Sequence, residues 1–432
     1  MDVPEGWAVP ATRERRRQMA SSTSPIGRPT LLVVGDAVAP TGFARVTRSL
    51  ISRWGERFDC HQLGVNYSGD PHRETWPIYP AGLGGDVHGV NRLPELAAKL
   101  RPDIILLVND MWIIADYLER LATTDHRSRL VAYIPVDGEP LPPALVARLA
   151  PLDRVVVYNS FGARALRDAE EKIQATQSTF RLPPLDIIPH GVDTTMFRPL
   201  FPLGPGVRNR RSAARAALLG DDPSREDPFI VLNANRNQPR KRIDVTIAGF
   251  AQFAAGKPSG VKLYLHMGAV DQGWDIPRLV ERHGISDRVL MSCDGAGPPD
   301  LTVDQLNQVY NACDVGLNTA EGEGWGLPSF EHAATAAAQI VPGHSGPGSV
   351  WSGHAEMLEP TLQVTTPGLQ TDAQLIAPAT VAATLEELYR NADLLFELST
   401  AAYELATNPA HCWDNIADRF GGLLEDTTGC SQ

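Results

Sequence analysis

The chain has 432 residues, 43% of them hydrophobic and 21% charged, and this composition excludes a disordered or fibrous protein. The formal net charge is −12, but residues 351–432 hold twelve acids and two bases, so the preceding 350 residues are nearly neutral and permit a local basic groove. No apolar stretch approaches the ~20 residues that cross a bilayer, and the five scattered cysteines exclude a disulfide framework or a clustered zinc site.

An arm and a first series of strands open the chain. Residues 1–28 are rich in Pro, Ser, Thr and Arg without an apolar period, so we expect a disordered or loosely packed arm that is not a secretory signal. Short apolar runs then begin. Because they are continuous and not alternating, they predict buried parallel strands in βαβ units. Within residues 29–198 these runs are 31–34, 104–108, 130–134, 155–157 and 187–188.

A Pro-rich stretch separates this half from a second one. Residues 199–228 contain five prolines around one short Ala-rich helix, which predicts a linker. Residues 229–395 then form another parallel α/β half. Its helical end places Leu385, Leu388, Ala392 and Leu395 on one expected helical face. The apolar runs of this half are 229–232, 261–265, 289–291, 315–317 and 340–341.

The most informative segment is Glu-Gly-Glu-Gly-Trp-Gly-Leu-Pro-Ser-Phe-Glu at 321–331. A Gly-rich turn that follows a strand and feeds a helix presents free N–H groups to a phosphate. Pro328 suits the first turn of that helix. Glu323 and Glu331 are carboxylates of the kind that hold vicinal sugar hydroxyls. The same spacing also fits an ordinary Gly-rich turn with two solvated glutamates.

A second segment, residues 233–244, follows the strand at 229–232. It carries four cations within seven residues, which would neutralise a diphosphate or would simply form a solvated basic loop. The two segments lie in one half, each at the end of a strand, and together they predict a nucleotide-diphosphate site. No Gly-x-x-x-x-Gly-Lys-Ser/Thr motif is present, and no Gly-x-Gly-x-x-Gly follows the first strand, so a P-loop NTPase and a dinucleotide dehydrogenase are disfavoured.

These residues resemble a known family. Arg236 and Lys241, five residues apart, and Glu323 and Glu331, eight apart around Gly-Trp-Gly-Leu-Pro, resemble the retaining family 4 glycosyltransferases of the GT-B fold. The resemblance runs from about residue 31 to 424 and is specific in the second half. Further matching segments are Gly35-Asp36 with 41–46, 186–193 with Phe197, 310–315 and 412–414.

The resemblance implies a fold of two Rossmann-like parallel α/β domains that face one another across a cleft. Residues 29–198 would bind the acceptor, residues 229–395 the nucleotide-sugar donor, and the C-terminal helices of 396–432 would return to the first domain. Arg236, Lys241 and Glu323 would be catalytic. The implied donor-binding residues are Gly42, Arg236, Lys241, Glu323, Gly324, Trp325, Gly326, Leu327 and Glu331.

Each of these residues has an implied role. Arg236 and Lys241 would bind the diphosphate and stabilise the departing charge, so no metal and no other cofactor is expected. Glu331 would hold the ribose, and Glu323 the hydroxyls of the donor sugar. Backbone N–H groups at 326 and 327 would meet the outer phosphate, and Gly42 would let the first loop approach the donor.

The acceptor side departs from the family pattern. Family members often have His-Asp at the end of the strand that corresponds to 130–134, whereas this chain has Pro-Val-Asp-Gly at 135–138. Asn109, Asp110 and Asp137 are therefore candidates for the sugar or acceptor side. His190 is a further candidate, with a structural turn role as its alternative.

The sequence thus predicts a cytoplasmic, metal-independent, retaining glycosyltransferase that uses a nucleotide-diphosphate sugar, UDP- or GDP-linked, and a carbohydrate or other hydroxyl acceptor. One alternative is a bacteriophage-type transferase that acts on a hydroxymethylated nucleic-acid base. The Arg-rich arm permits this alternative without requiring it. Another alternative is a catalytically silent scaffold that binds nucleotide sugars. Neither reading includes a membrane span.

Overall fold

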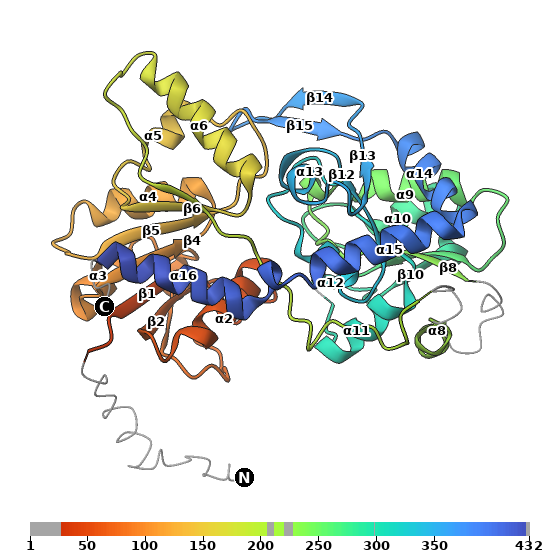
Figure 1. Ribbon diagram of the computed structural model, residues 1–432, viewed down its shortest axis with the longest axis horizontal. Coiled ribbons are helices and arrows are strands. Elements are labelled where there is room, and N and C mark those ends of the chain that lie inside the picture. The colour runs from red at the N-terminus through yellow and green to blue at the C-terminus, as the bar shows by residue number, and fades with distance from the viewer. Residues whose placement is uncertain (1–26, 205–210, 220–227, 298, 429–432) are drawn as a thin grey trace, which may run out of the picture.

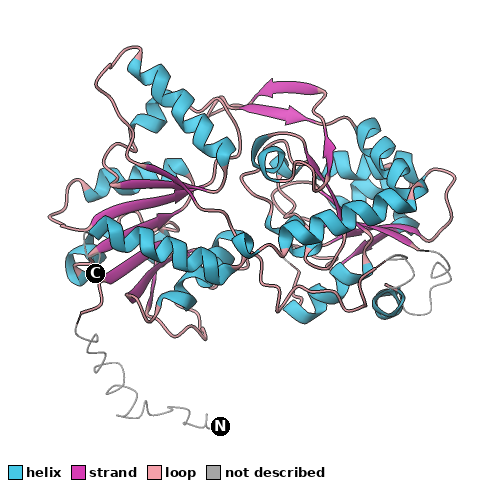
Figure 2. Ribbon diagram, in the orientation of Figure 1, coloured by secondary structure: helices cyan, strands magenta, loops and turns pink. Residues whose placement is uncertain are grey.

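The computed structural model describes residues 27–204, 211–219, 228–297 and 299–428. Most of the predicted arm and much of the predicted linker lie outside these residues. Two α/β domains are visible, each a twisted sheet with helices on both faces (Figures 1 and 2). The expected fold class is confirmed.

The first domain contains a seven-stranded parallel sheet in the order β3-β2-β1-β4-β5-β6-β7. Four of its five predicted apolar runs are buried strands, and every residue of 104–108 is at most 1% exposed. The fifth run, 187–188, overlaps the partly buried strand β7 only at Ile187. A continuous apolar run suits these strands because helices cover both faces of the sheet. The strands are β1 (Thr30–Asp36), β2 (Asp59–Val65), β3 (Ile78–Pro80), β4 (Ile104–Val108), β5 (Arg129–Ile134), β6 (Arg154–Val157) and β7 (Leu185–Ile187). The helices are α2 (Gly42–Trp54), α3 (Arg92–Leu100), α4 (Met111–Leu121), α5 (Pro143–Ala147) and α6 (Ser160–Gln174), with a short turn η1 (Leu83–Gly85).

The second domain repeats this topology with a six-stranded parallel sheet in the order β10-β9-β8-β11-β12-β13. In both sheets the first strand of the series lies beside a strand reached by a crossover, and ligands of such sheets bind at that switch point. The strands are β8 (Phe229–Asn233), β9 (Val261–Leu265), β10 (Val289–Met291), β11 (Val315–Leu317), β12 (Ala338–Pro342) and β13 (Glu356–Leu358). The helices are α8 (Ser212–Leu219), α9 (Ile243–Ala254), α10 (Ile276–Arg282), α11 (Val303–Ala312), α12 (Leu327–Ala333), α13 (Ser345–Val350), α14 (Pro378–Arg390) and α15 (Ala392–Ala406), with turns η3 (Pro239–Lys241) and η4 (Ser286–Arg288).

An antiparallel hairpin, β14 (Leu362–Thr365) and β15 (Asp372–Leu375), extends from the second domain toward the first (Figure 1). The amide of Asp372 donates to the carbonyl of Glu139 at 2.9 Å, and that of Gln374 donates to Glu321 at 3.0 Å. The hairpin therefore joins a first-domain loop to the Gly-rich segment of the second domain.

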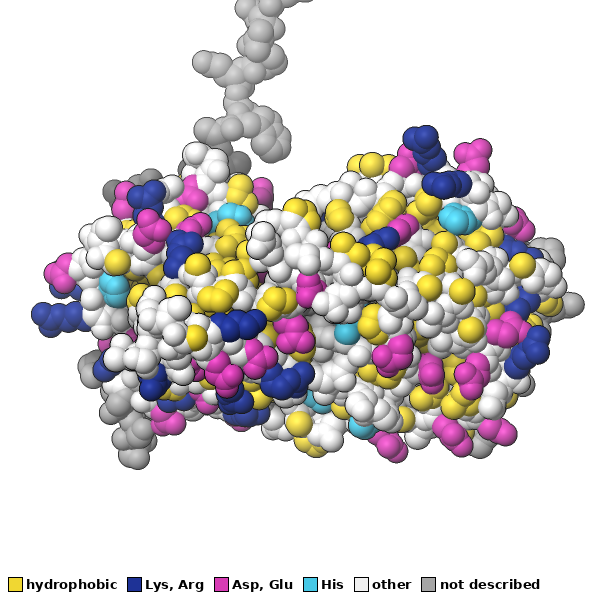
Figure 3. Space-filling model, turned by 90° about the horizontal axis from the view of Figure 1, so that it is seen from above, with side chains coloured by type: hydrophobic (Ala, Val, Ile, Leu, Met, Phe, Trp, Pro, Cys, Tyr) yellow, Lys and Arg dark blue, Asp and Glu magenta, His cyan; other side chains and the backbone are white. Residues whose placement is uncertain are grey.

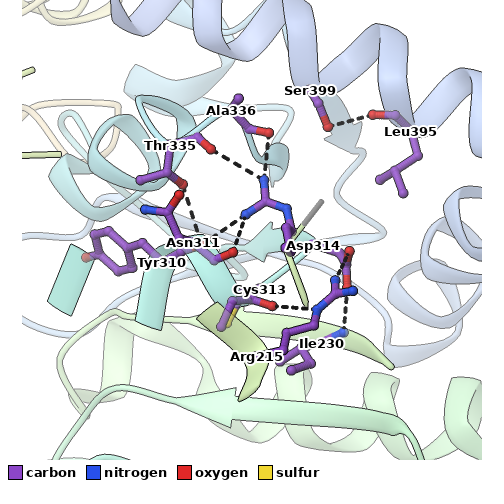
Figure 4. A network of polar contacts seen from close by, with 12 residues as sticks. Arg215, Ile230, Tyr310, Asn311, Cys313, Asp314, Thr335, Ala336, Leu395 and Ser399 are labelled. Carbon is purple, nitrogen blue, oxygen red and sulfur yellow. Dashed lines mark hydrogen bonds and ion pairs between the residues drawn. The ribbon is translucent and has the colours of Figure 1, made fainter. Parts of the chain in front are cut away.

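The predicted linker is in part a piece of the second domain. Two arginines from the α8 segment, Arg211 and Arg215, are buried, and Arg215 pairs with Asp314 (Figure 4). Arg211 donates to the carbonyls of Asn311 at 2.9 Å and of Ala336 at 2.7 Å, near the carboxyl ends of α11 and α12. Cations are favourable at helix carboxyl ends, so these contacts fasten α8 to the second domain.

The chain returns to the first domain later than predicted. The expected boundary at 395 falls inside α15, which packs on β12 and α12 of the second domain. The expected continuous face from Leu385 to Leu395 is divided between α14 and α15, because Asn391 caps a new helix by accepting from the amide of Leu394 at 3.0 Å. The return is made by η5 (Pro409–His411) and α16 (Trp413–Thr428), which lies on α2 (Figure 1).

Hydrogen bonds and ion pairs hold α16 against the first domain. The indole of Trp54 donates to the carbonyl of Ala417 at 2.9 Å, and Arg57 binds both carboxylate oxygens of Glu425 at 2.9 and 2.6 Å. A parallel bridge joins Val192 to Cys412, so the two chain crossings between the domains lie side by side.

Candidate functional site

The predicted residues come together where the two domains meet. We call this region the interdomain seam, and define it by Gly42 and Asp137 of the first domain and Gly322, Gly324 and Leu327 of the second. A Cβ at Gly322 would lie 2.6 Å from the backbone oxygen of Asp137, and one at Gly324 would lie 3.0 Å from its carboxylate. Side chains at these two positions would push the domains apart. At Gly42 a Cβ would lie 3.4 Å from Leu327, which is ordinary contact, so the seam itself does not demand that glycine.

Lys241 and Glu323 form a buried ion pair. Lys241 ends η3, Glu323 lies between β11 and α12, and their side chains are 8% and 9% exposed. Burial opposes the charge of Glu323, but Lys241 and Arg240 outweigh it, so its pKa is lowered and the carboxylate is ionised at neutral pH. The amide of Glu323 donates to the hydroxyl of Ser345 at 3.2 Å, which fixes this loop. The two segments that were expected to share one site therefore meet beyond the ends of β8 and β11.

Glu331 is engaged from both domains. It lies on α12, is 3% exposed, and accepts from the hydroxyl of Tyr310 at 3.2 Å. Its other carboxylate oxygen pairs with Arg45, which projects from α2 of the first domain. Arg45 is a site residue that no sequence motif indicates, since the contact with Glu331 forms only where the two domains meet.

Arg236 reaches the same edge but points to another partner. Its guanidinium binds both oxygens of Asp271, at 2.8 and 3.2 Å, and 49% of the side chain is exposed. This hydrogen-bonded pairing lowers the pKa of Asp271. Arg236 is therefore held near the seam by a carboxylate that follows β9.

The Gly-rich turn has the backbone that the sequence implied. Gly326 has φ +91°, a conformation that favours glycine, and it precedes Leu327, the first residue of α12. Trp325, for which the resemblance implied a donor-binding role, has a buried side chain. Its ring is 3% exposed and stacks on Phe330 at 4.7 Å, so the side chain is a packing element and only its backbone faces the turn.

His190 is also a packing residue. It is 4% exposed, its Nδ1 lies 2.8 Å from the hydroxyl of Tyr133, and its ring lies 4.0 Å from that of Tyr158. Burial lowers the pKa of His190 to about 3, so it is neutral at physiological pH. The acceptor-side role suggested for His190 is not supported by this geometry, and its structural alternative is.

The remaining acceptor-side candidates follow β4 and β5. Asn109 is buried and accepts from the amide of Asp110 at 2.9 Å. Burial and the nearby Asp137 raise the pKa of Asp110 to about 7, while Arg240 acts in the opposite direction. Asp137 lies 3.4 Å from Arg240 of the second domain. Asp110 and Asp137 thus form a carboxylate pair beside the donor half of the seam.

One more first-domain carboxylate organises the loop before Gly42. Asp36, at the end of β1, accepts from Thr41 at 2.5 Å and from Asn66 at 3.1 Å. Burial raises the pKa of Asp36. These bonds set the course of the loop into α2, and so place Arg45.

A separate cavity of about 300 Å³ lies on the far side of the 137–139 loop. It is bounded by α6 and the β14–β15 hairpin, with Glu139, Lys172 and Gln374 in its lining. The predicted donor residues do not line it. Within the described residues, no three His, Cys, Asp or Glu side chains are grouped in a way that would hold a metal ion.

Comparisons with known proteins agree with this architecture. No family model matches the sequence. Among solved structures, sucrose-phosphate synthase from Thermosynechococcus elongatus superposes with a TM-score of 0.66 at 17% identity and covers 94% of this chain and 100% of its own. A trehalose-6-phosphate structure from E. coli, bound with UDP-2-fluoro glucose, gives 0.64 at 12% identity and covers 92% and 99%. The chain has the GT-B fold.

Sequence relatives of this GT-B chain carry a glycosyltransferase name. A D-inositol 3-phosphate glycosyltransferase from Segniliparus rotundus is 35% identical over 153 residues, which are 35% of this chain and 30% of the relative. Its counterpart from Mycolicibacterium vanbaalenii is 32% identical over 181 residues, or 40% and 36%. The matches span about a third of these relatives. The expected GT-B fold is confirmed, and the expected resemblance to glycosyltransferases is found over the matched part of the chain. In the described residues no helix is long and apolar enough to cross a membrane, and a cytoplasmic location stays a prediction.

Proposed function

We propose that this GT-B chain is a retaining glycosyltransferase that moves a sugar from a nucleotide-diphosphate sugar to an acceptor hydroxyl at the interdomain seam. The observation that carries the proposal is the buried Lys241–Glu323 pair with Glu331 on the adjoining helix, all at the switch point of the second sheet. The UDP-sugar bound to the E. coli neighbour supports a UDP-sugar as the first donor to test.

The donor would replace ion pairs that now span or border the seam. Glu331 would exchange Arg45 for the ribose hydroxyls, and Arg236 would exchange Asp271 for a phosphate. Glu323 would keep Lys241 and hold hydroxyls of the donor sugar. Because Arg45 comes from the first domain, binding of the ribose to Glu331 would break this contact between the domains.

In the chemical step the acceptor hydroxyl attacks the anomeric carbon on the face that the diphosphate leaves. The bond from that carbon to the phosphate oxygen breaks, and the departing oxygen takes the hydroxyl proton, so the configuration is retained. Lys241 and Arg236 stabilise the charge that develops on the diphosphate. We propose that these two cations serve in place of a divalent metal. Turnover should then survive EDTA, and loss with EDTA that Mg²⁺ restores would contradict this part.

The acceptor is proposed to be a polyol or carbohydrate bound to the first domain. The name of the relatives refers to a phosphorylated cyclitol as the acceptor of those proteins. In this chain the carboxylates of Asp110 and Asp137 would accept hydrogen bonds from acceptor hydroxyl groups. The nucleic-acid and scaffold alternatives have no support in the comparisons. On the face seen in Figure 3, the described Lys and Arg side chains are interspersed with Asp and Glu, without the broad basic field that duplex binding uses.

The test is a panel of UDP-glucose, UDP-N-acetylglucosamine, UDP-galactose and GDP-mannose, with D-inositol 3-phosphate and free glucose as acceptor probes. One donor should raise the thermal unfolding midpoint and release its nucleoside diphosphate on turnover. A ligand at 100 times its dissociation constant adds ~2.7 kcal/mol to the free energy of unfolding, a readily measured shift. Absence of binding and turnover with every donor would refute the proposal.

A further inference from the structure

Arg240 makes contacts on both sides of the seam. One nitrogen of its guanidinium lies 3.4 Å from a carboxylate oxygen of Asp137, in the first domain. The same nitrogen donates to the carbonyl of Gly322 at 3.1 Å and lies 3.7 Å from Glu323, in the second domain. The backbone of Arg240 is fixed as well, because its carbonyl accepts from the amide of Glu321 at 2.9 Å. A single side chain thus joins the loop after β5 to the Gly-rich turn.

The other cations of this basic segment are paired within the second domain. Arg236 binds Asp271, Lys241 binds Glu323, and Arg242 binds Asp244 on the next helix. Of these four described side chains, Arg240 forms the ion pair with the first domain. Its side chain is 40% exposed, so it lies at the opening of the seam and not in the core.

The carboxylates that face Arg240 come from the two halves of the proposed site. Asp137, with Asp110 beside it, belongs to the domain that would hold the acceptor, and Glu323 belongs to the turn that would hold the donor sugar. The charged groups that shift the pKa of Asp110 are Asp137 and Asp36, which raise it, and Arg240, which lowers it. A charged guanidinium nitrogen that contacts one partner in each half limits how far the two halves can move relative to one another.

We propose that Arg240 is a positioning residue that holds Asp137 of the acceptor half in register with Glu323 of the donor half. The inference rests on the proposed glycosyltransferase function and adds a residue to it. Transfer requires the acceptor hydroxyl to lie close to the anomeric carbon, and a displacement of about 1 Å between reacting groups can lower a rate ~10²-fold. Arg240 acts through the two carboxylates and not on the reacting atoms.

A direct role on the diphosphate is the competing reading, and the two differ in what Arg240→Gln changes. As a positioning residue, the variant loses about tenfold in kcat/KM for transfer to the acceptor probe D-inositol 3-phosphate, while the Kd for UDP stays within about twofold. Arg240→Lys should recover part of the lost kcat/KM, because an ammonium group keeps the positive charge but lacks the planar guanidinium. A loss of UDP affinity as large as the loss of transfer would overturn the proposal.

A double variant checks that Arg240 works through Asp137. Asp137→Asn should lower transfer by a similar factor, and the combination with Arg240→Gln should lower it little further, because both remove one interaction. If the factors by which the two single variants lower kcat/KM multiply in the double variant, Arg240 and Asp137 act independently and the proposal is overturned. Arg154→Gln is the matched control, since Arg154 pairs with Asp186 at 2.8 Å entirely inside the first domain.

Hydrogen exchange gives a readout that does not need turnover. In Arg240→Gln the amides of residues 135–141 should exchange faster than in the parent chain, and those in Arg154→Gln should not. If no nucleotide sugar is turned over yet this difference appears, the proposed function fails and the bridge stands. If exchange at 135–141 is unchanged in Arg240→Gln, the bridge itself is refuted.

Discussion

Replacing Lys241 by alanine removes the cation that neutralises a buried carboxylate. Lys241 and Glu323 are 8% and 9% exposed, so the pair is shielded from water. After the substitution Glu323 keeps Arg240, at 3.7 Å, and its hydrogen bond with Asn318. Removing one partner of a buried pair costs ~3–5 kcal/mol of stability, and because Arg240 remains we expect ~2 kcal/mol here. The loss of charge stabilisation on the diphosphate should lower kcat ~10²-fold, or ~2.7 kcal/mol.

The pH dependence of the stability loss follows from Glu323. Its pKa is lowered in the folded chain, so the stabilisation by ionised Glu323 is present above the ordinary value of 4.5 and is lost as the pH falls through the folded pKa. The deficit of Lys241→Ala should therefore be full at pH 7 and should shrink on acidification below 4.5. Denaturant unfolding at several pH values measures it, and release of nucleoside diphosphate measures kcat.

A matched control comes from a second buried lysine of the same domain. Lys262, on β9, is 6% exposed and donates to the carbonyl of Asp287 at 2.9 Å, away from the seam. Lys262→Ala should cost stability and leave kcat within about threefold, since its ammonium has no part in the chemical step. Near-normal kcat in Lys241→Ala, or an equal loss in both variants, would refute the role assigned to Lys241.

Three further outcomes are expected. Glu331→Gln should weaken UDP binding ~10-fold by isothermal titration, because an amide is a poorer partner for ribose hydroxyls than a carboxylate, and unchanged affinity would remove Glu331 from the ribose site. Asp110 has a folded pKa of about 7, above its ordinary 3.8, so the folded chain loses stability as the pH rises from 4 to 7. The stability gained by Asp110→Asn should therefore grow over that range to a few kcal/mol, and a pH-independent difference would contradict the raised pKa. Arg57→Ala, which frees Glu425 of α16 at a partly exposed site, should lower the free energy of unfolding by ~1 kcal/mol and lose that effect in 1 M salt, while a salt-independent loss would point to packing.

Buried strands were the part of the fold that sequence patterns predicted best. Runs such as 104–108 are apolar on both faces because helices cover the sheet on each side. The second strand, β2, was missed because it carries His61 and Gln62. Gln62 is buried only because it bonds to the carbonyl of Asp36 and to the indole of Trp76, and that pairing becomes visible only in three dimensions.

The sequence predicted those site residues that lie within short local motifs. Lys241 and Glu323 lie in segments that follow β8 and β11, and Glu331 lies on α12, which continues from the second of these segments. Their meeting therefore follows from the parallel topology. Arg45 and Arg240 owe their roles to the way the two domains pack, which no short motif encodes. For His190 the sequence left a cleft-facing role and a structural role open, and the structure packs its ring against Tyr133 and Tyr158.

A crystal structure of the chain with UDP tests the central claim most directly. We predict that the diphosphate lies within hydrogen-bond distance of Lys241 and that the ribose hydroxyls contact Glu331. Arg45 should no longer be paired with the Glu331 carboxylate. UDP bound elsewhere on the molecule at saturating concentration, with the Arg45–Glu331 pair intact, would contradict it.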